Sequence, residues 1–499
     1  MSRLRELLSR LIPSGSLAER TMKSGVWMSG IKISGRVLQI LMLIILARLL
    51  APRDFGLMGI ALLTLSGTKQ FTKIGLNAAL IHQIEENVDE YLDTTWCLEV
   101  ARGLLISSVL FVAAPTIASL FGEPEATPLI RVIGLSPLLY GLRNPGVVYF
   151  QKHLEFHKEF VYRSSGDLTQ FTVGVGYALI SPTVWALVFA FVATDAVRLV
   201  LSYAIHDYRP WPSFDTDAAW ELIDYGKWVT GSSIIYFLYS QGDDAFVGWF
   251  LSATALGFYQ YAYQIADTPS SEVSEVIASV TFPAYSRLQD DPAALRNALL
   301  RTLRVTAFVV FPMAFGIALV APSFVPVALG PEWTPMILTM QILAIYGLLH
   351  ALTRNFGSLW KAIGRPDLIA KLGLIRVTLI AIFIWPATAA WGIEGTALVV
   401  VGVYVLPMLP LDVYIVTRTV EVTNTQIYRE FVYPFVAAGT MFGVLWHVRS
   451  VLSLSPLFEL VVIIPAGVII YLVSAALLDF AFDWGIERNL RSMVVTLMS

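Results

Sequence analysis

The sequence predicts an all-α polytopic membrane protein with fourteen transmembrane helices. We expect two six-helix lobes related by a pseudo-two-fold axis along the membrane normal, followed by two appended helices. Three observations lead to this prediction. The chain is 56% hydrophobic and only 14% charged, which is too apolar for a soluble protein of 499 residues. Proline, glycine and charge clusters divide it into fourteen apolar stretches, and a weak repeat relates the first six stretches to the next six.

Each apolar stretch is long enough to cross a bilayer, for which a helix needs about 20 mostly apolar residues. The expected spans are 22–48, 57–81, 95–121, 127–150, 160–182, 184–206, 222–250, 255–284, 298–322, 335–360, 367–389, 393–417, 429–447 and 457–479. The second, fifth and eighth spans contain charged stretches. An even number of spans places both termini on one side of the membrane.

The repeat is clearest where GVWMSGIKI at 25–33 recurs as GKWVTGSSI at 226–234, an offset of 201 residues. The offset continues without a gap, so that Gly56 falls on Gly257. Because six spans separate the copies and six is even, both units enter the membrane from the same side, which gives a parallel repeat. We interpret the glycines as sites of close helix packing and Trp27 and Trp228 as anchors at the headgroup level.

The expected organisation follows from the spans and from the basic loops. It comprises a cytoplasmic or interfacial segment (1–21), an N-terminal six-helix lobe (22–206), a cytoplasmic linker (207–221), a C-terminal six-helix lobe (222–417), two appended helices (429–479) and a cytoplasmic tail (480–499). Most loop lysines and arginines lie on the side of the termini, so both termini are predicted to be cytoplasmic in a cell-membrane protein. The acidic loop at 82–94 is an exception. The N-terminal segment has no long apolar run or cleavage site, so we interpret it as a retained interfacial helix.

Several classes of function are excluded or disfavoured. A net charge of −3 gives no basic face for nucleic acid. The single cysteine, Cys97, excludes an intrachain disulfide and a CxxC metal site. The chain has no Walker, HExxH or GxSxG motif and no loop that could hold a catalytic domain. A secondary transporter without metal or cofactor is therefore expected, and not an enzyme.

Basic residues inside the first two spans are the first candidate site, because charges within a membrane are costly unless they face a cavity or a partner. Lys32 and Arg36 lie one turn apart in the first span, and Lys69 and Lys73 lie one turn apart in the second. At about 1.5 Å per residue, the two pairs reach comparable depth. Four clustered cations would suit a polyanionic ligand such as a diphosphate.

Arg143, beside Asn144 and Pro145 in the fourth span, is a further candidate, although a helix break alone would also explain this run. The alternative for the basic residues is that some extend to the headgroups or pair with carboxylates in the same half of the chain. The carboxylates available for this are Glu99, Asp167 and Asp195.

The second half carries charges of the opposite sign. In the repeat, Met42 and Leu43 of the first span correspond to Asp243 and Asp244 of the seventh. Asp267 follows in the eighth span. Adjacent carboxylates in a low-dielectric site repel one another, which would suit a site for a coupling proton or Na⁺. They could equally serve as counter-ions for the basic half.

Three segments resemble the polysaccharide-transport flippases of the multidrug/oligosaccharidyl-lipid/polysaccharide exporter superfamily. They are ARLLAPRDFGLMGIALLTL (47–65) with the following GLNAALIHQ, FGEPEATPLIRVIGLSPLLYGLRNPGVVYFQKHLEF (121–156), and QGDDAFVGWFLSATALGFYQYAYQIADTPSSEVSEVIASVTFPAYSRLQDD (241–291). The resemblance implies fourteen helices in two lobes that form a V. It implies that a polyprenyl-diphosphate-linked oligosaccharide is flipped from the cytoplasmic to the outer leaflet. Trp249 departs from the arginine usual in the family at its position, so no cation is expected there.

On this resemblance, Lys32, Arg36, Lys69 and Lys73 would line the cavity and hold the diphosphate while the lipid tail stays in the bilayer. The partners would be the lipid-linked oligosaccharide, membrane lipids, a coupling Na⁺ or H⁺, and transiently the glycosyltransferases or polymerase of the same pathway. One alternative is a small-molecule cation antiporter of the same superfamily, which would need an acidic, aromatic-lined cavity. A second is a membrane glycan polymerase or ligase, which usually carries a large extracytoplasmic loop.

Overall fold

A computed structural model describes residues 17–72, 88–152, 155–213, 216–452 and 455–485, and every regular element in these ranges is helical. The chain divides into two compact units. The first contains the residues up to Phe237 and the segment Gly248–Gly257, and the second contains Leu238–Val247 and the residues from Phe258 onward. Most of the 1–21 segment, Lys73, and the last residues of the expected tail lie outside the described residues.

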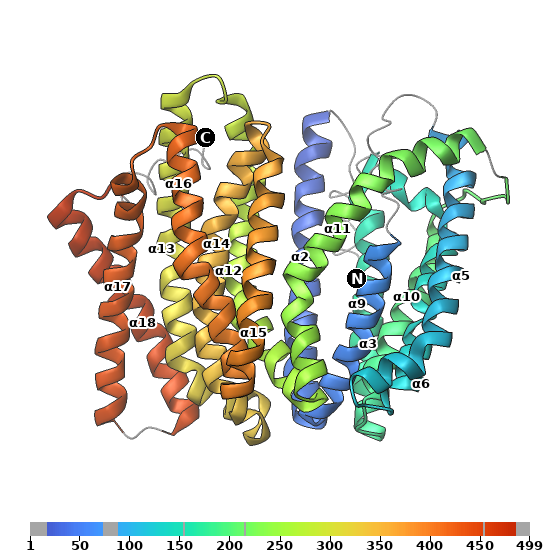
Figure 1. Cartoon of the computed structure of the whole chain (residues 1–499), viewed down its shortest axis with the longest axis horizontal. Coiled ribbons are helices and arrows are strands. Elements are labelled where there is room, and N and C mark those ends of the chain that lie inside the picture. Colours follow the sequence, from blue (N-terminus) through green and yellow to red (C-terminus); the bar gives the residue numbers. More distant parts are fainter. Residues whose placement is uncertain (1–16, 73–87, 153–154, 214–215, 453–454, 486–499) are drawn as a thin grey trace, which may run out of the picture. The chain divides into compact units, whose positions relative to one another are not determined.

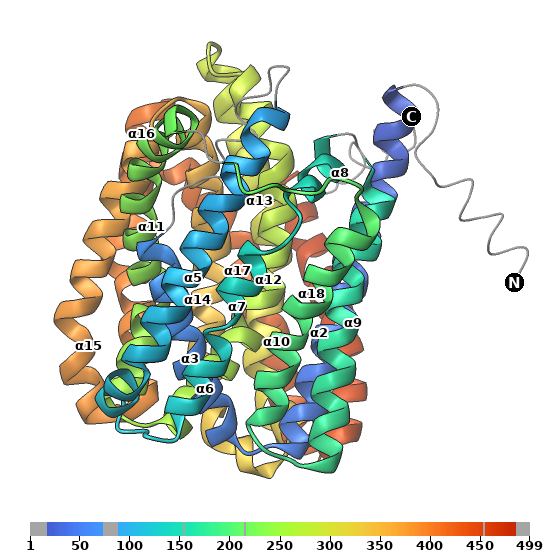
Figure 2. The ribbon, with the colours of Figure 1, turned by 90° about the vertical axis from the view of Figure 1, so that its right-hand side faces the viewer.

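Among its described residues, the first unit contains eight α-helices, a 3₁₀ turn and most of a ninth helix. They are α2 (Leu17–Leu49), α3 (Pro52–Phe71), α5 (Val88–Leu120), α6 (Ala126–Ile133), α7 (Ser136–Gly141), η1 (Pro145–Val148), α8 (Tyr149–Lys152), α9 (Phe156–Ile180), α10 (Trp185–Ile205) and the first part of α11 (Thr216–Phe250). Helix α9 packs against both α2 and α10, and Figure 2 shows these three side by side.

The expected fourth span, 127–150, is broken into short pieces. Pro137 lies in the first turn of α7 and Pro145 opens η1, so a new helical segment starts at each of these prolines. The broken stretch packs closely on α5, because a Cβ on Gly141 would overlap the backbone of Glu99. The break leaves Arg143 between two helical segments, where its side chain is directed by loop backbone and not by a continuous helix.

The first copy of the repeated motif is a packing site. The Trp27 and Phe160 rings lie 5.1 Å apart between centroids, and a Cβ on Gly30 would lie 3.5 Å from the Phe160 ring. The motif thus joins α2 to α9, as its small residues predicted. The side chains of the second copy before Ser233 lie outside the described residues.

Repeat-related residues also meet one another. A Cβ on Gly56 would overlap the carbonyl oxygen of Ala253, and a Cβ on Gly257 would overlap the carbonyl oxygen of Pro52. The offset of 201 residues relates Pro52 to Ala253 and Gly56 to Gly257. The contact is therefore reciprocal, as a local two-fold relation requires, and it depends on the absence of a side chain at both glycines.

The second unit contains the segment Leu238–Val247 of α11 and the helices that follow. They are α12 (Ala253–Arg287, from Phe258 onward in this unit), α13 (Pro292–Phe324), the π-helical turn η2 (Val325–Leu329), the 3₁₀ helix η3 (Pro331–Met336), α14 (Ile337–Ala362), α15 (Pro366–Val403), the π-helical turn η4 (Tyr404–Met408), α16 (Leu409–Val420), α17 (Asn424–Val451) and α18 (Pro456–Phe482). A break inside α15 at Trp391 and Gly392 separates the expected eleventh and twelfth spans, and Gly392 has the positive φ of +59° that favours glycine. Helices α17 and α18 pack on α13 and on each other (Figure 1).

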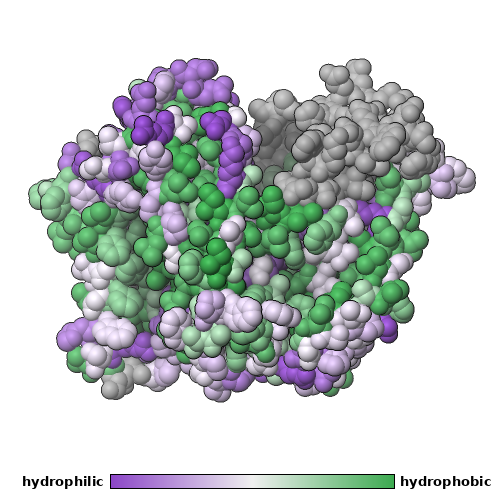
Figure 3. All heavy atoms as spheres, viewed as in Figure 1, coloured by the Kyte–Doolittle hydropathy of each residue, from purple (hydrophilic) through white to green (hydrophobic). Residues whose placement is uncertain are grey.

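The helices have the lengths and surfaces of membrane spans. Eight helical stretches among the described residues are long and apolar enough to cross a bilayer. In Figure 3, the surface of the second unit is hydrophilic at both ends and mostly hydrophobic between them. The structure is therefore that of an all-helical polytopic membrane protein.

Candidate binding sites

A cluster of charged residues in the first unit brings together two of the predicted basic residues. Lys69, in the last turn of α3, is partly buried, and it interacts electrostatically with Arg143 and Asp195. Arg102 and Glu99 of α5 complete the group. Three cations thus face two carboxylates.

Asp195, on α10, is the centre of the cluster. The guanidinium of Arg143 pairs with one carboxylate oxygen, and the hydroxyl of Ser136 donates to the other. The side chains of Arg143 and Asp195 are 11% and 14% exposed, so the pair is largely removed from water. The Arg143 guanidinium also stacks on the Tyr140 ring at 4.8 Å, and its buried Nε has no hydrogen-bond partner among the described residues.

Each of the three acidic residues considered as partners of the basic residues pairs with an arginine, and one of these arginines is the predicted Arg143. Besides Arg143 with Asp195, Arg102 pairs with Glu99 at 3.2 Å and Arg198 with Asp167 at 2.9 Å. Arg102 further donates to the backbone carbonyls of Thr72 and Lys69, where it satisfies the C-terminus of α3. Within the described chain, no hydrogen bond or ion pair reaches the ammonium group of Lys69.

Two of the remaining predicted basic residues lie on α2. Arg36 donates to Gln39 one turn along α2 at 2.9 Å, and the Lys32 side chain is exposed on the same helix. The structure thus brings Lys69 and Arg143 together. Lys32 and Arg36 are placed on α2, and Lys73 lies outside the described residues.

The acidic pair of the second unit has only neutral hydrogen-bonding partners in the described chain. Tyr259 donates its hydroxyl to Asp243 at 2.7 Å, and Gln260 donates to Asp244 at 3.2 Å. One buried oxygen of Asp244 has no partner among the described residues. Asp243 is 8% exposed, so its carboxylate is held in a low-dielectric site without a neutralising arginine or lysine there.

Asp267 lies in a separate polar group on α12. It contacts Nδ1 of His350 at 3.1 Å and accepts a hydrogen bond from Ser271 at 2.7 Å. His350 in turn stacks on Tyr346, which belongs to the cavity described next.

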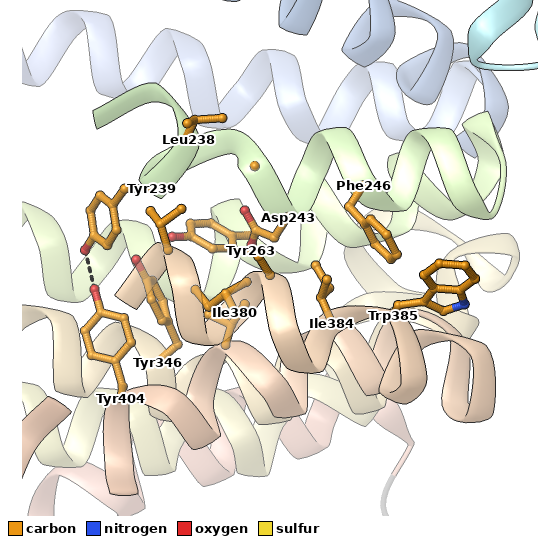
Figure 4. Close-up of a pocket in the computed structure, with 14 residues that line it drawn as sticks. Leu238, Tyr239, Asp243, Phe246, Tyr263, Tyr346, Ile380, Ile384, Trp385 and Tyr404 are labelled. Carbon is orange, nitrogen blue, oxygen red and sulfur yellow. Dashed lines mark hydrogen bonds between the residues drawn. The ribbon is translucent and has the colours of Figure 1, made fainter. Parts of the chain in front are cut away.

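A cavity of about 280 Å³ lies within the second unit beside Asp243. Six of its fourteen lining residues are aromatic: Tyr239, Phe246, Tyr263, Tyr346, Trp385 and Tyr404. Figure 4 shows the hydrogen-bonded hydroxyls of Tyr239 and Tyr404 at one end, Phe246 and Trp385 at the other, and Asp243 between them. The lining is therefore acidic and aromatic, which is the kind of cavity named above for a cation transporter.

Arg376 is a further buried cation, and it is not among the residues expected from the sequence. Its Nη1 donates to the Tyr404 hydroxyl at 2.6 Å, and its guanidinium lies 3.9 Å from the centre of the Tyr404 ring and 4.6 Å from that of Tyr239. It fixes the two tyrosines that close one end of the cavity. A charged residue within the apolar run LGLIRVTLI (372–380) is the signal that could have identified it.

Comparisons with known proteins identify the family. The family model described as "Polysaccharide biosynthesis protein" matches residues 45–338, which is more than half of the chain. The chain is 27% identical to the lipopolysaccharide biosynthesis protein WzxC of Escherichia coli over 73% of this chain and 74% of that protein. It is 25% identical to the probable low-salt glycan biosynthesis flippase Agl15 of Haloferax volcanii over 60% of this chain and 63% of that protein.

A solved structure shows the same fold. The lipid II flippase MurJ in an inward closed conformation matches with a TM-score of 0.76 at 14% identity, over 91% of this chain and 99% of that one. At this identity the likeness concerns the fold alone. Together with the family match it confirms the resemblance stated from the sequence. The chain is a multi-pass membrane protein that belongs to the polysaccharide biosynthesis protein family.

Proposed function

We propose that this protein is a flippase that translocates a polyprenyl-diphosphate-linked oligosaccharide from the cytoplasmic to the outer leaflet for cell-surface glycan biosynthesis. Its family and its relatives in lipopolysaccharide and glycan biosynthesis support this function. The protein is a transporter and not an enzyme. The observation in the structure that carries the substrate class is the charged cluster around Lys69, in which cations outnumber carboxylates by three to two.

Lys69 and Arg143 form the anion subsite of this proposal. The ammonium of Lys69 has hydrogen-bonding capacity that no described residue uses, and Arg143 has an unused Nε. A diphosphate offers several charged oxygens that accept from both groups, and a guanidinium suits phosphate geometry. In this proposal Lys32, Arg36 and Lys73 extend the basic surface along the path of the headgroup.

The transport cycle we propose is alternating access by fourteen spanning helices, with both termini in the cytoplasm. Two six-helix lobes would rock about a pseudo-two-fold axis and expose the basic residues first to one side and then to the other. The reciprocal contact of Gly56 and Gly257 supports such an axis. The carboxylates Asp243, Asp244 and Asp267 would carry a coupling proton or Na⁺, which is supported by the neutral surroundings of the acidic pair.

The function is tested by measuring translocation of a lipid-linked oligosaccharide in inverted membrane vesicles. We expect Arg36→Ala and Lys69→Ala each to slow translocation relative to the wild type. Lys371→Ala is the matched control, because its side chain is 69% exposed and, among the residues that the structure describes, forms an ion pair only with Asp367 at the surface. Translocation at the wild-type rate in both Arg36→Ala and Lys69→Ala would overturn the assignment of the basic residues to the substrate.

A further inference from the structure

The cavity of the second unit contains a carboxylate that no lysine or arginine in its lining neutralises. Asp243 lines the cavity and is buried, and in the described chain both it and Asp244 bond only to neutral side chains. Arg376, the guanidinium at the cavity end, is engaged with Tyr404. A buried carboxylate is costly unless a positive charge accompanies it, so the site favours an occupant that brings one.

The lining indicates what kind of cation fits. Aromatic faces attract a cation through their quadrupole, and rings around a carboxylate suit an ion whose charge is spread over carbon and hydrogen. Arg376 already makes this interaction with the rings of Tyr239 and Tyr404. The rings of Tyr263, Tyr346, Phe246 and Trp385 provide further aromatic surface along the same cavity.

A hard metal ion fits less well. Such ions take about six oxygen ligands or more, whereas the cavity offers one carboxylate and tyrosine hydroxyls that are partly engaged, as between Tyr239 and Tyr404. No three acidic, histidine or cysteine side chains among the described residues come together as metal ligands. The volume of about 280 Å³ lies just below the ~300–1,000 Å³ of sites for drug-sized ligands, which indicates a compact ligand.

We propose that this cavity is a binding site for a compact organic monocation, a quaternary ammonium or a protonated amine. The cation lies against the aromatic walls and pairs with the carboxylate of Asp243. This site is additional to the anion subsite in the first unit, and it goes beyond the flippase function. A ligand of this class would be recognised independently of the lipid-linked oligosaccharide.

The test is direct binding of radiolabelled tetraethylammonium to the purified full-length protein in nanodiscs, without any lipid-linked oligosaccharide. We expect saturable binding that Asp243→Asn weakens at least ~10-fold, a change of about 1.4 kcal/mol. Asp291→Asn is the matched control: Asp291 caps α13 outside the cavity, and asparagine caps a helix equally well, so binding should be unchanged.

A second variant keeps the test decisive if Asp243→Asn does not fold. Phe246→Ala removes one cavity wall and leaves the carboxylate in place, and we expect it to weaken binding as well. Absence of saturable binding to the wild type, or equal binding by the wild type and a folded Asp243→Asn variant, would overturn the proposal. Binding of ²²Na⁺ with no binding of tetraethylammonium would also overturn it, in favour of a metal ion. Flipping of the lipid-linked oligosaccharide is measured in a separate assay, so failure of cation binding and failure of flipping are distinguishable; binding of ²²Na⁺ would instead support the coupling role proposed for Asp243.

Discussion

The guanidinium of Arg143 pairs with the carboxylate of Asp195, and the hydroxyl of Ser136 donates to the second oxygen of that carboxylate. Asp195 therefore binds the Arg143 guanidinium, which is one of the groups that we assign to the substrate diphosphate. A carboxylate held in this way stabilises a buried arginine while no substrate is bound. Asp195 must lose at least part of this pairing when a phosphate binds to Arg143.

The first prediction concerns this competition. We expect Asp195→Asn to bind inorganic pyrophosphate about 10-fold more tightly than the wild type, because the change removes a negative charge beside Lys69 and Arg143; this corresponds to about 1.4 kcal/mol. Isothermal titration calorimetry on the detergent-solubilised protein measures it. Asp167→Asn is the control, because Asp167 pairs with Arg198. Unchanged or weaker pyrophosphate binding by Asp195→Asn would show that Asp195 does not compete with the ligand.

The second prediction concerns the contact of the two repeat copies. In Gly56→Ala, the new Cβ would overlap the carbonyl oxygen of Ala253, and overpacking of this kind costs ~1–3 kcal/mol. We expect a lower thermal midpoint of unfolding. Gly176→Ala is the matched control in the same unit, since its Cβ would meet nothing within 4 Å. Equal midpoints for the two variants would contradict the close approach.

The third prediction concerns an ion pair between α13 and α17. Glu430 is 3% exposed, accepts two hydrogen bonds from Arg304 at 2.7 and 2.8 Å, and accepts a third from the Trp484 ring at 3.0 Å. Breaking a fully buried pair costs ~3–5 kcal/mol. We expect the loss of stability in Glu430→Gln to lie at the lower end of this range, because 21% of the Arg304 side chain remains exposed.

The thermal midpoint of unfolding measures this loss too. Asp367→Asn changes a surface carboxylate paired with Arg365 and Lys371, and we expect it to leave the midpoint almost unchanged. If Glu430→Gln were as stable as Asp367→Asn, the Arg304 pair would not contribute to the packing of α17.

The fourth prediction concerns the end of the cavity. Tyr404→Phe keeps the ring under Arg376 and removes the hydroxyl that accepts from its Nη1. A buried donor left without a partner costs ~1–3 kcal/mol, so we expect lower thermal stability. Tyr414→Phe is the control, because Tyr414 is 54% exposed. A midpoint for Tyr404→Phe equal to that of the control would mean that Arg376 finds another partner.

Much of the helix pattern could be predicted because length and apolar composition constrain a membrane span strongly. The expected spans 298–322 and 457–479 correspond to α13 (Pro292–Phe324) and α18 (Pro456–Phe482). The expected span 127–150 is instead broken, because Pro137 and Pro145 start new helical segments and Gly141 admits the backbone of α5. Hydropathy alone does not register such breaks.

From the sequence, candidate site residues could be named, but their partners could not. The cost of a charge in a membrane identified Lys69, Arg143 and Asp243 from their positions. The partners of these residues depend on packing between helices distant in sequence, as when Asp195 of α10 reaches Arg143. Arg376 was missed because a single charge in a long apolar run forms no motif, and its role arises from Tyr239 and Tyr404, which the fold brings to it.

The proposed function is flipping of a lipid through recognition of its diphosphate. It is tested by reconstituting the purified protein in liposomes with a fluorescent polyprenyl-diphosphate-linked oligosaccharide, or with the same molecule carrying a monophosphate, and measuring how fast each becomes accessible on the opposite leaflet. We expect the protein to accelerate translocation of the diphosphate compound over protein-free liposomes, and to accelerate translocation of the monophosphate compound less. Acceleration of neither compound, or equal acceleration of both, would contradict it.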